Sequence, residues 1–406
     1  MSVMQQVDAR PGTQVVPATR PRRPSAVTTK ALLICKGLGF GSPEGHQVHG
    51  FDMYRDELAG QLGLEVERVQ AWSFDEIDRA IQARSVDVVM VMISWREPAE
   101  EAIEFFRRLS ERPNRPEIVF IDYYAPTCSP HFGVLPHVDR YVKRQVLRDR
   151  TLYQEDLEGG YIFTDYAAKY LGFTLNGWSF GSKPDPAHLH KLTVGWNLGV
   201  TPRYRKFLKA TRPLAPLWDL RPFDINRRVG IDKSTAAREW YQEYRSLTLD
   251  RLGSLGPGSR CTGTGRIGRV GYFAEMAASK IVVSPFGWGE LGFRDYEAVA
   301  LGALLIKPSM EHLETSPNIF VPGETYVPVA WDGRDIAEKC RYYLDRPEQA
   351  KEIIRNAQRA LADYYENHGF VEDIRRSLGL PGAPASRPRP VSGELRRENG
   401  RPGLAR

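Results

Sequence analysis

The 406-residue chain is long enough for two domains, because single hydrophobic cores rarely grow beyond about 250–300 residues. Its hydrophobic fraction (42%) and charged fraction (26%) exclude a disordered or fibrous protein, and no apolar run approaches the ~20 residues that a membrane span requires. The net charge of +6 comes from two ends, 1–30 and 382–406, which each carry a net +4, so the rest of the chain is slightly acidic and nucleic-acid binding is disfavoured.

Both ends are rich in Pro and Arg and cannot build a core, so we expect disordered basic tails at residues 1–29 and 381–406. A peripheral membrane contact through these tails stays open. The four cysteines are scattered without CxxC or metal-ligand spacing, which predicts free thiols and no metal site. The first thirty residues lack the apolar core of a secretory signal. Together these features predict a cytoplasmic protein.

The first half of the chain predicts alternating strands and helices, which is typical of a parallel sheet with right-handed crossovers. Ligands of such sheets bind at the carboxyl ends of the strands, so the loops after residues 35, 93 and 122 are expected to face one cleft. In chain order we expect strands at 31–35, 64–71, 86–93, 117–122 and 139–143, and helices at 51–62, 74–83 and 98–112.

A second series of strands and helices follows an irregular stretch, 150–220, which is interpreted as the crossover between domains. The predicted domains are 30–205 and 206–380, so the fold class is α/β. The second series contains expected strands at 221–226, 280–284 and 303–306, and helices at 236–251, 271–278, 293–301, 335–344 and 347–368.

The most informative stretch is SPFGWGELGFRDYEAVALGALLIKP, residues 284–308. It predicts a buried strand, a glycine-rich loop, a helix and a second strand. Glycine allows the backbone to approach a ligand closely, and a helix N-terminus presents free N–H groups to anions. A basic side chain, Arg294, stands in the first turn of that helix, where the helix dipole disfavours a cation. The stretch therefore predicts a site for an anionic, phosphate-bearing ligand.

This stretch resembles the donor-binding element of GT-B glycosyltransferases of the family 1 and exostosin-like branches. The resemblance rests on S-P-x-G at 284–287, on Glu290, on R-x-x-E-A at 294–298 and on the G-x-L-x-I-x-P-like run at 302–308. It extends from about residue 271 to 365, roughly a quarter of the chain. It implies two Rossmann-like domains facing a cleft, with the final helix crossing back to the first domain.

The resemblance also implies roles for individual residues. Glu290 is expected to be catalytic, contacting the donor sugar or the acceptor hydroxyl, and Glu297 is expected to bind the ribose. The two are seven positions apart, where many retaining members have eight, so the stereochemical outcome stays open. The other expected donor-binding residues shape the loop or neutralise the diphosphate, and they are Ser284, Phe286, Gly287, Gly289, Arg294, Arg227 and Arg228.

The first domain offers candidates for a catalytic base. His46 and His49 follow the first strand, and a histidine can accept a proton near neutral pH. Asp122, at the end of the fourth strand, is a rival, and a loop histidine is more often a bystander than a catalytic base. Gly39 and Gly41 are expected to form a loop on the acceptor side.

The predicted function is metal-independent transfer of a sugar, of hexosyltransferase type, from a nucleoside diphosphate donor to a hydroxylated acceptor. The acceptor could be a glycan, a lipid-linked sugar or a secondary metabolite. No cofactor is expected beyond the nucleotide sugar itself. Two alternatives stay open, a nucleotide-sugar epimerase of the same fold and a catalytically silent binding or scaffold protein. The sequence leaves the base, the sugar and the oligomeric state undetermined.

Overall fold

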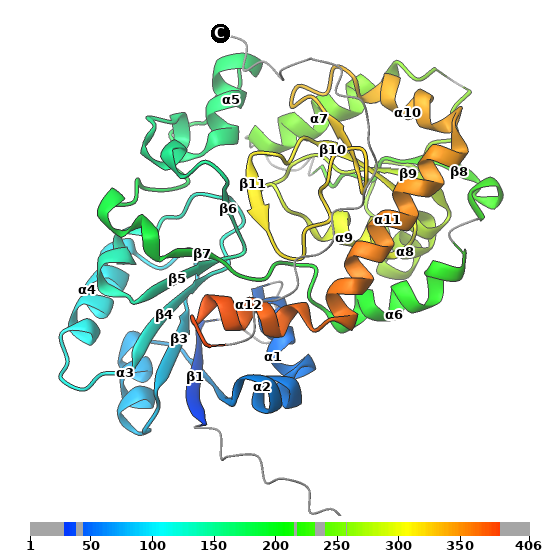
Figure 1. Ribbon diagram of the computed structural model, residues 1–406. Coiled ribbons are helices and arrows are strands. Elements are labelled where there is room, and N and C mark those ends of the chain that lie inside the picture. The colour runs from blue at the N-terminus through cyan, green and yellow to red at the C-terminus, as the bar shows by residue number, and fades with distance from the viewer. Residues whose placement is uncertain (1–27, 38–43, 215–216, 232–239, 257, 382–406) are drawn as a thin grey trace, which may run out of the picture.

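The computed structural model describes residues 28–37, 44–214, 217–231, 240–256 and 258–381 (Figure 1). The two predicted tails, apart from residues 28, 29 and 381, lie outside the described residues, and so do Gly39 and Gly41 of the expected acceptor-side loop. The described part divides into two sheets, each with its own helices, at the lower left and upper right of Figure 1.

The first sheet has six parallel strands in the order β2-β1-β3-β4-β5-β7. Its central strand β3 is VVMVM, and all five side chains are buried, as expected for a strand covered on both faces. Ala31 of β1 pairs with Val66 on one side and with Val88 on the other. The strands are β1 (Thr29–Lys36), β2 (Leu64–Ala71), β3 (Val88–Met92), β4 (Glu117–Asp122), β5 (Arg140–Lys143) and β7 (Leu192–Val194).

Five helices accompany this sheet in the described part of the first half. The Ser73 hydroxyl caps α3 by accepting a hydrogen bond from Glu76 N at 3.1 Å. The described helices are α1 (His49–Met53), α2 (Arg55–Leu62), α3 (Phe74–Gln82), α4 (Ala99–Ser110) and α5 (Ile162–Leu171).

The single helix expected at 51–62 is in fact two helices. They break at Tyr54, whose φ of −124° and ψ of 26° are not helical. Tyr54 is buried, stacks on Phe370 at 5.7 Å and donates a hydrogen bond to the Tyr365 carbonyl. Packing against the distant C-terminal segment therefore overrides the helical periodicity of the sequence.

The expectation of an irregular stretch at 150–220 is also wrong in part, because this stretch contains α5 and α6 (Pro202–Thr211). Pro202 stands at the first position of α6, where its missing N–H costs no hydrogen bond. Phe163 of α5 packs between aromatic rings of the second domain, including Phe286 at 4.8 Å. The burial of α5 thus depends on residues far away in the sequence.

The second sheet has four parallel strands in the order β12-β10-β9-β8. Of the helix expected at 236–251, residues 236–239 lie outside the described part of the chain. The strands are β8 (Phe223–Asn226), β9 (Ser279–Val283), β10 (Leu304–Pro308) and β12 (Val327–Val329), and the helices are α7 (Trp240–Gly253), α8 (Arg269–Ala277), α9 (Phe293–Ala300), α10 (Ile336–Leu344) and α11 (Pro347–Glu366).

Two features tie the halves together. Strand β6 (Gln145–Leu147) pairs antiparallel with β11 (Leu313–Thr315), and the two lie side by side at the centre of Figure 1. Helix α12 (Gly369–Ser377) returns to the first domain and packs against α2 and β7. The returning segment is thus α12, while α11, the helix expected to cross, packs on β10 and α9 of the second domain.

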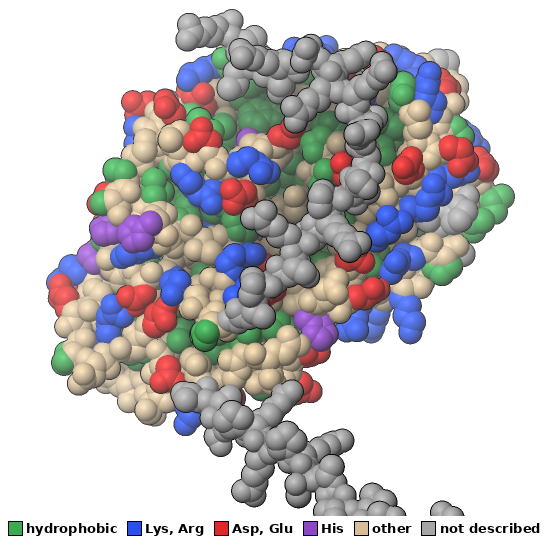
Figure 2. Space-filling view, viewed as in Figure 1, with side chains coloured by type: hydrophobic (Ala, Val, Ile, Leu, Met, Phe, Trp, Pro, Cys, Tyr) green, Lys and Arg blue, Asp and Glu red, His purple; other side chains and the backbone are tan. Residues whose placement is uncertain are grey.

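The expected fold class is confirmed: two Rossmann-like α/β units with parallel sheets. The exact boundary at 205/206 stays a prediction, since α6 spans that position between β7 and β8. In the space-filling view, Lys and Arg side chains lie beside Asp and Glu side chains over much of the visible face (Figure 2). Among the described helices, none has the length and apolar character needed to cross a bilayer.

Candidate functional site

A cleft of about 930 Å³ lies between the two domains. Its first-domain wall comes from residues that follow β3, β4 and β5, such as Trp95, Tyr124 and Arg144. Its second-domain wall comes from residues that follow β8 and β9, such as Arg228 and Ser284. The cleft is therefore lined from the carboxyl ends of strands in both parallel sheets, where α/β folds place their ligands.

The glycine-rich loop forms part of this cleft and reaches across to the first domain. A Cβ on Gly289 would overlap the Ala125 carbonyl, and a Cβ on Gly287 would lie 2.8 Å from the Arg245 guanidinium. Both glycines line the cleft, and any larger residue would push the domains or Arg245 away. The loop therefore needs glycine because it lies close to Ala125 and Arg245, while the close approach to a ligand stays a prediction.

The loop is held onto helix α9 by Asp295. Its carboxylate accepts hydrogen bonds from Gly292 N at 2.9 Å and from the Ser284 hydroxyl at 2.5 Å, and lies 3.2 Å from Lys307 Nζ. Asp295 is fully engaged in this way, and the hydrogen-bond acceptors of Arg294 lie elsewhere. The acid also caps the N-terminus of α9, which borders the cleft.

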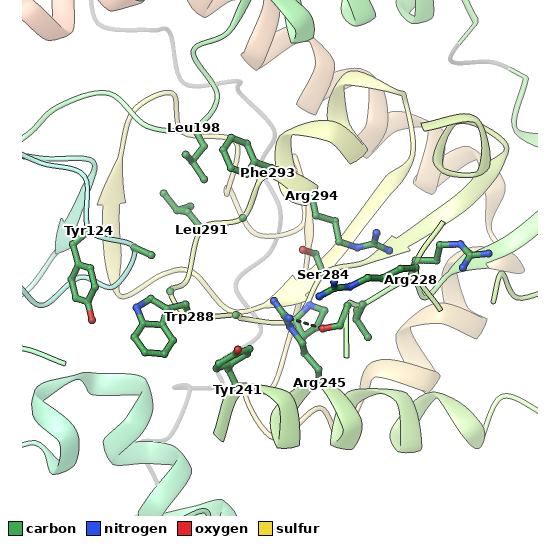
Figure 3. A pocket seen from close by; sticks show the side chains of 18 of the residues that line it. Tyr124, Leu198, Arg228, Tyr241, Arg245, Ser284, Trp288, Leu291, Phe293 and Arg294 are labelled. Atoms are coloured by element: carbon green, nitrogen blue, oxygen red, sulfur yellow. Dashed lines mark hydrogen bonds between the residues drawn. The ribbon is translucent and has the colours of Figure 1, made fainter. Parts of the chain in front are cut away.

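Arg294 points along the second-domain wall (Figure 3). Its guanidinium donates to the Asn226 side-chain oxygen at 2.6 Å, to the Asn226 carbonyl at 3.0 Å and to the Val283 carbonyl at 2.9 Å. These partners are the carboxyl ends of β8 and β9. They fix the orientation of the cation but carry no opposing charge, so its charge stays available to the cleft.

Two further arginines lie near Arg294 on the same wall (Figure 3). Arg228 forms an ion pair with Glu275 and donates to the Gly265 carbonyl at 2.5 Å. Arg245 of α7 donates to the Gly230 carbonyl at 2.6 Å, the dashed line in Figure 3, and lies over the Tyr241 ring. Sequence reasoning missed Arg245, because no local motif links α7 to the loop.

The described lining of the cleft contains six arginines and no aspartate or glutamate. A cavity with this balance favours an anionic ligand, because fixed positive charge raises the local concentration of anions. Nor do three His, Cys, Asp or Glu side chains gather anywhere in the described residues as a possible metal site. The arginines are Arg96, Arg144, Arg228, Arg245, Arg266 and Arg294.

Aromatic side chains cover the other end of the cleft. Trp288, from the glycine-rich loop, lies 5.7 Å from Trp95, 5.4 Å from Trp178 and 5.8 Å from Tyr241, measured between ring centroids. Sequence reasoning did not find the three rings around Trp288. They come from three separate elements, so no sequence spacing relates them.

Several expected donor-binding residues lie behind the surface of the cleft rather than on it. Glu297 is buried and accepts a hydrogen bond at 2.9 Å from the hydroxyl of Tyr272, which does line the cleft. Burial raises the pKa of Glu297. Phe286 is fully buried against Phe163, and Arg227 donates to the Thr262 carbonyl at 3.0 Å.

Glu290 is buried at the contact between the domains and does not line the cleft. Its carboxylate accepts hydrogen bonds from Thr127 at 2.8 Å and from Gln145 at 3.3 Å, both from the first domain, and lies 3.8 Å from His312 Nε2. Burial alone would raise the pKa of Glu290, but His312 and Thr127 hold it below its ordinary value. The contact with a donor or acceptor that the resemblance implies stays a prediction.

The candidate bases of the first domain also lie off the described cleft surface. The Nδ1 atoms of His46 and His49 are 3.3 Å apart, and the His46 ring packs on Phe293, a cleft residue. Burial lowers the pKa of both histidines. Asp122, the rival base, is buried 3.1 Å from Lys143 Nζ and accepts a hydrogen bond from Tyr141 at 2.8 Å.

The structure thus brings together five of the expected donor-binding residues on the cleft surface, namely Ser284, Gly287, Gly289, Arg294 and Arg228. Residues 231–375, most of the second domain, match the family model described as glycosyl transferase-like. The second domain is therefore similar to glycosyl transferase-like proteins. This match and the two facing sheets confirm the family resemblance of the glycine-rich stretch.

Solved structures that are similar to the chain share little sequence with it. They include Anabaena HepE in complex with UDP-glucose (12% identity, 86% of this chain, 99% of that chain, TM-score 0.45). A glycosyltransferase from Rickettsia africae is also similar (13% identity, 87% of this chain, 98% of that chain, TM-score 0.48). So is a UDP-forming trehalose-phosphate synthase from Burkholderia xenovorans (11% identity, 86% of this chain, 100% of that chain, TM-score 0.49). No curated protein matches the chain.

Proposed function

We propose that this protein transfers a sugar, of hexosyl type, from a nucleoside diphosphate sugar to a hydroxyl group of an acceptor. The observation that carries the proposal is the interdomain cleft with six arginines and no carboxylate in its described lining. A nucleotide sugar offers a diphosphate to such a surface and a sugar to its aromatic end. The glycosyl transferase-like family of the second domain supports the same activity.

The arginines offer a way to stabilise the leaving group without a metal ion. When the bond to the sugar breaks, negative charge develops on the diphosphate, and preorganised positive groups lower the barrier. Arg294, fixed by Asn226 and Val283, and the adjacent N-terminus of α9 are such groups. We therefore propose metal-independent transfer, in which these cations supply the charge that a divalent ion provides elsewhere.

Glu297 is proposed to act at the ribose, through or beside Tyr272. The Tyr272 hydroxyl lines the cleft and holds the Glu297 carboxylate at 2.9 Å. A small rotation of the Tyr272 side chain would expose the Glu297 carboxylate to the two hydroxyl groups of the ribose. The raised pKa of Glu297 reflects burial without a fully matched cation, a situation that a hydrogen-bonding ligand would relieve.

The test is release of the nucleoside diphosphate from a panel of UDP, GDP and TDP sugars, with and without EDTA. We expect the nucleoside diphosphate to be released from the sugars of one of these three nucleotides, and we expect EDTA not to lower the rate. Arg294→Ala is expected to lower kcat by roughly 10²–10³, the loss typical of one preorganised donor, and Arg294→Lys to restore only part of it. A thermal melt of each variant checks that the bonds to Asn226 and Val283 were not needed for folding.

Other outcomes assign the alternatives. Complete loss of activity in EDTA, restored by Mg²⁺ or Mn²⁺, would contradict the metal-independent account. Conversion of the donor sugar to its epimer would make the protein an epimerase. Tight binding of a nucleoside diphosphate without turnover of any donor would identify the protein as a catalytically silent binding protein.

A further inference from the structure

Arg144 is the most deeply buried cation of the cleft lining. It follows β5 directly, and its side chain is 8% exposed. Its Nε has no hydrogen-bond partner, and within the described residues no carboxylate lies within ion-pair distance of its guanidinium. The next residue back, Lys143, is also buried but has Asp122 at 3.1 Å. Of these two neighbours, only Arg144 has no carboxylate at ion-pair distance, although Asp122 and Glu290 attract it from farther away.

The carboxylates nearest to Arg144 are already engaged. Asp122 holds Lys143 and the Tyr141 hydroxyl, and Glu290 accepts from Thr127 and Gln145. Burial lowers the pKa of Arg144 to about 10, so it is still charged at neutral pH. A buried cation without a hydrogen-bonded partner is costly, and an anionic ligand that paired with Arg144 in the cleft would offset that cost.

The arginines of the cleft divide between its two walls. Four of them stand on the second domain, around the loop and helix that face the proposed donor diphosphate. The other two, Arg96 and Arg144, stand on the first domain. Arg96 is exposed and lies 4.6 Å over the Trp95 ring, so it borders the mouth, while Arg144 lies deep in the cleft. The first-domain wall thus has its own positive charge.

We propose that Arg144 binds an anionic group, a phosphate or a carboxylate, on the acceptor substrate. The proposal rests on the proposed function, since it assigns the acceptor to the first-domain wall opposite the donor loop. A guanidinium offers paired donors to either group, and the deep position would fix the acceptor relative to the donor sugar. Arg96, at the mouth of the cleft, would attract the same anionic group.

The test is a calorimetric titration of protein saturated with whichever of UDP, GDP or TDP it binds. The probes are inorganic phosphate, glucose 6-phosphate, glucuronate and glucose. We expect at least one anionic probe to bind and glucose to bind much more weakly. Comparison of glucose 6-phosphate with glucuronate distinguishes a site for phosphate from a site for carboxylate. Arg144→Gln is expected to lower the affinity for the anionic probe by about tenfold or more and to change the affinity for the nucleotide by less than about twofold. Arg144→Lys is expected to lower the affinity for the anionic probe less than Arg144→Gln does.

The matched control is Arg79→Gln, an exposed arginine on α3 that is far from the cleft lining, and it is expected to change neither affinity. Without ligand, Arg144→Gln is expected to melt at or above the wild-type temperature, because no partner is lost. A clearly lower melting temperature would make Arg144 a structural residue and overturn the proposal.

Two further results would overturn it. If no anionic probe binds the nucleotide-saturated protein, the second anion site does not exist. If Arg144→Gln weakens the nucleotide as strongly as the probe, Arg144 belongs to the donor site. Should no nucleoside diphosphate bind at all, the proposed function fails; the probes are then titrated into the ligand-free protein, where binding that depends on Arg144 would still support the anion site.

Discussion

Glu290 joins the two domains through a buried carboxylate. Its partners Thr127 and Gln145 come from the first domain, and the neighbouring His312 comes from the second. A buried acid of this kind stabilises the contact only while its hydrogen bonds are complete, because each orphaned polar group costs free energy. The geometry assigns Glu290, a residue of the glycine-rich loop, to the junction between the domains.

Replacing Glu290 tests this assignment. Glu290→Ala is expected to lower the free energy of unfolding by about 2–4 kcal/mol, because it leaves buried donors unpaired and a cavity, while Glu290→Gln is expected to cost less. Urea unfolding measures both, with the exposed Glu65→Ala as a control that is expected to stay within about 0.5 kcal/mol of wild type. A Glu290→Gln variant with unchanged stability but abolished turnover would instead favour the catalytic role that the resemblance implies.

Sequence reasoning found the residues of the cleft that share one local motif. Gly287, Gly289 and Arg294 stand within eight positions of each other, where strand, loop and helix signals agree. It did not find Arg144 or Arg245, because their roles depend on which strand ends face each other across the domains. Nor could it foresee that Glu290 turns away from the cleft surface, since the spacing of a loop residue does not fix the direction of its side chain.

At the scale of elements, α12 carries much of the contact between the C-terminus and the first domain. Phe370 packs against Phe51 and Trp196, at 5.2 and 5.1 Å between centroids. Gly50 faces the same ring so closely that a Cβ there would overlap it. This helix was not expected from the sequence as a separate element, and its anchoring explains why the helix predicted at 51–62 breaks at Tyr54.

The anchor of α12 includes a titrating acid, Asp373. It is 2% exposed, accepts a hydrogen bond from Tyr364 at 2.7 Å and pairs with Arg376. Burial raises the pKa of Asp373 to about 6, although Arg376 and Tyr364 oppose the shift. In the unfolded chain an aspartate titrates near ~3.9, so the folded protein holds the proton more tightly.

The stability contributed by Asp373 is therefore present at low pH and lost as the pH rises. Relative to Asp373→Asn, the wild-type free energy of unfolding is expected to fall by about 2–3 kcal/mol between pH ~4 and pH ~6, and to level off above that. Urea unfolding of both proteins from pH 4.5 to 7 measures the difference. A difference that is constant across this window, or that grows with rising pH, would show that the ion pair with Arg376 outweighs burial.

At the scale of the whole molecule, the repeated strand–helix pattern is enough to predict two α/β domains, because each parallel strand needs a local crossover. The sheet order could not be predicted, since the sequence of a strand does not name its neighbours, and the strand pair β6–β11 joins residues more than a hundred positions apart. This pairing makes the two domains share a strand contact as well as the buried junction at Glu290.

The central claim is that the arginine-lined cleft between the domains binds a nucleoside diphosphate through its phosphates. Calorimetric titration of the full chain with a nucleoside diphosphate and with the corresponding nucleoside tests it most directly. The account predicts that the diphosphate binds about 100-fold or more tightly than the nucleoside, the equivalent of one or two charge-assisted contacts, and that this ratio shrinks as salt is added. Equal affinities for the two ligands, or no binding of uridine, guanosine or thymidine diphosphate, would contradict it.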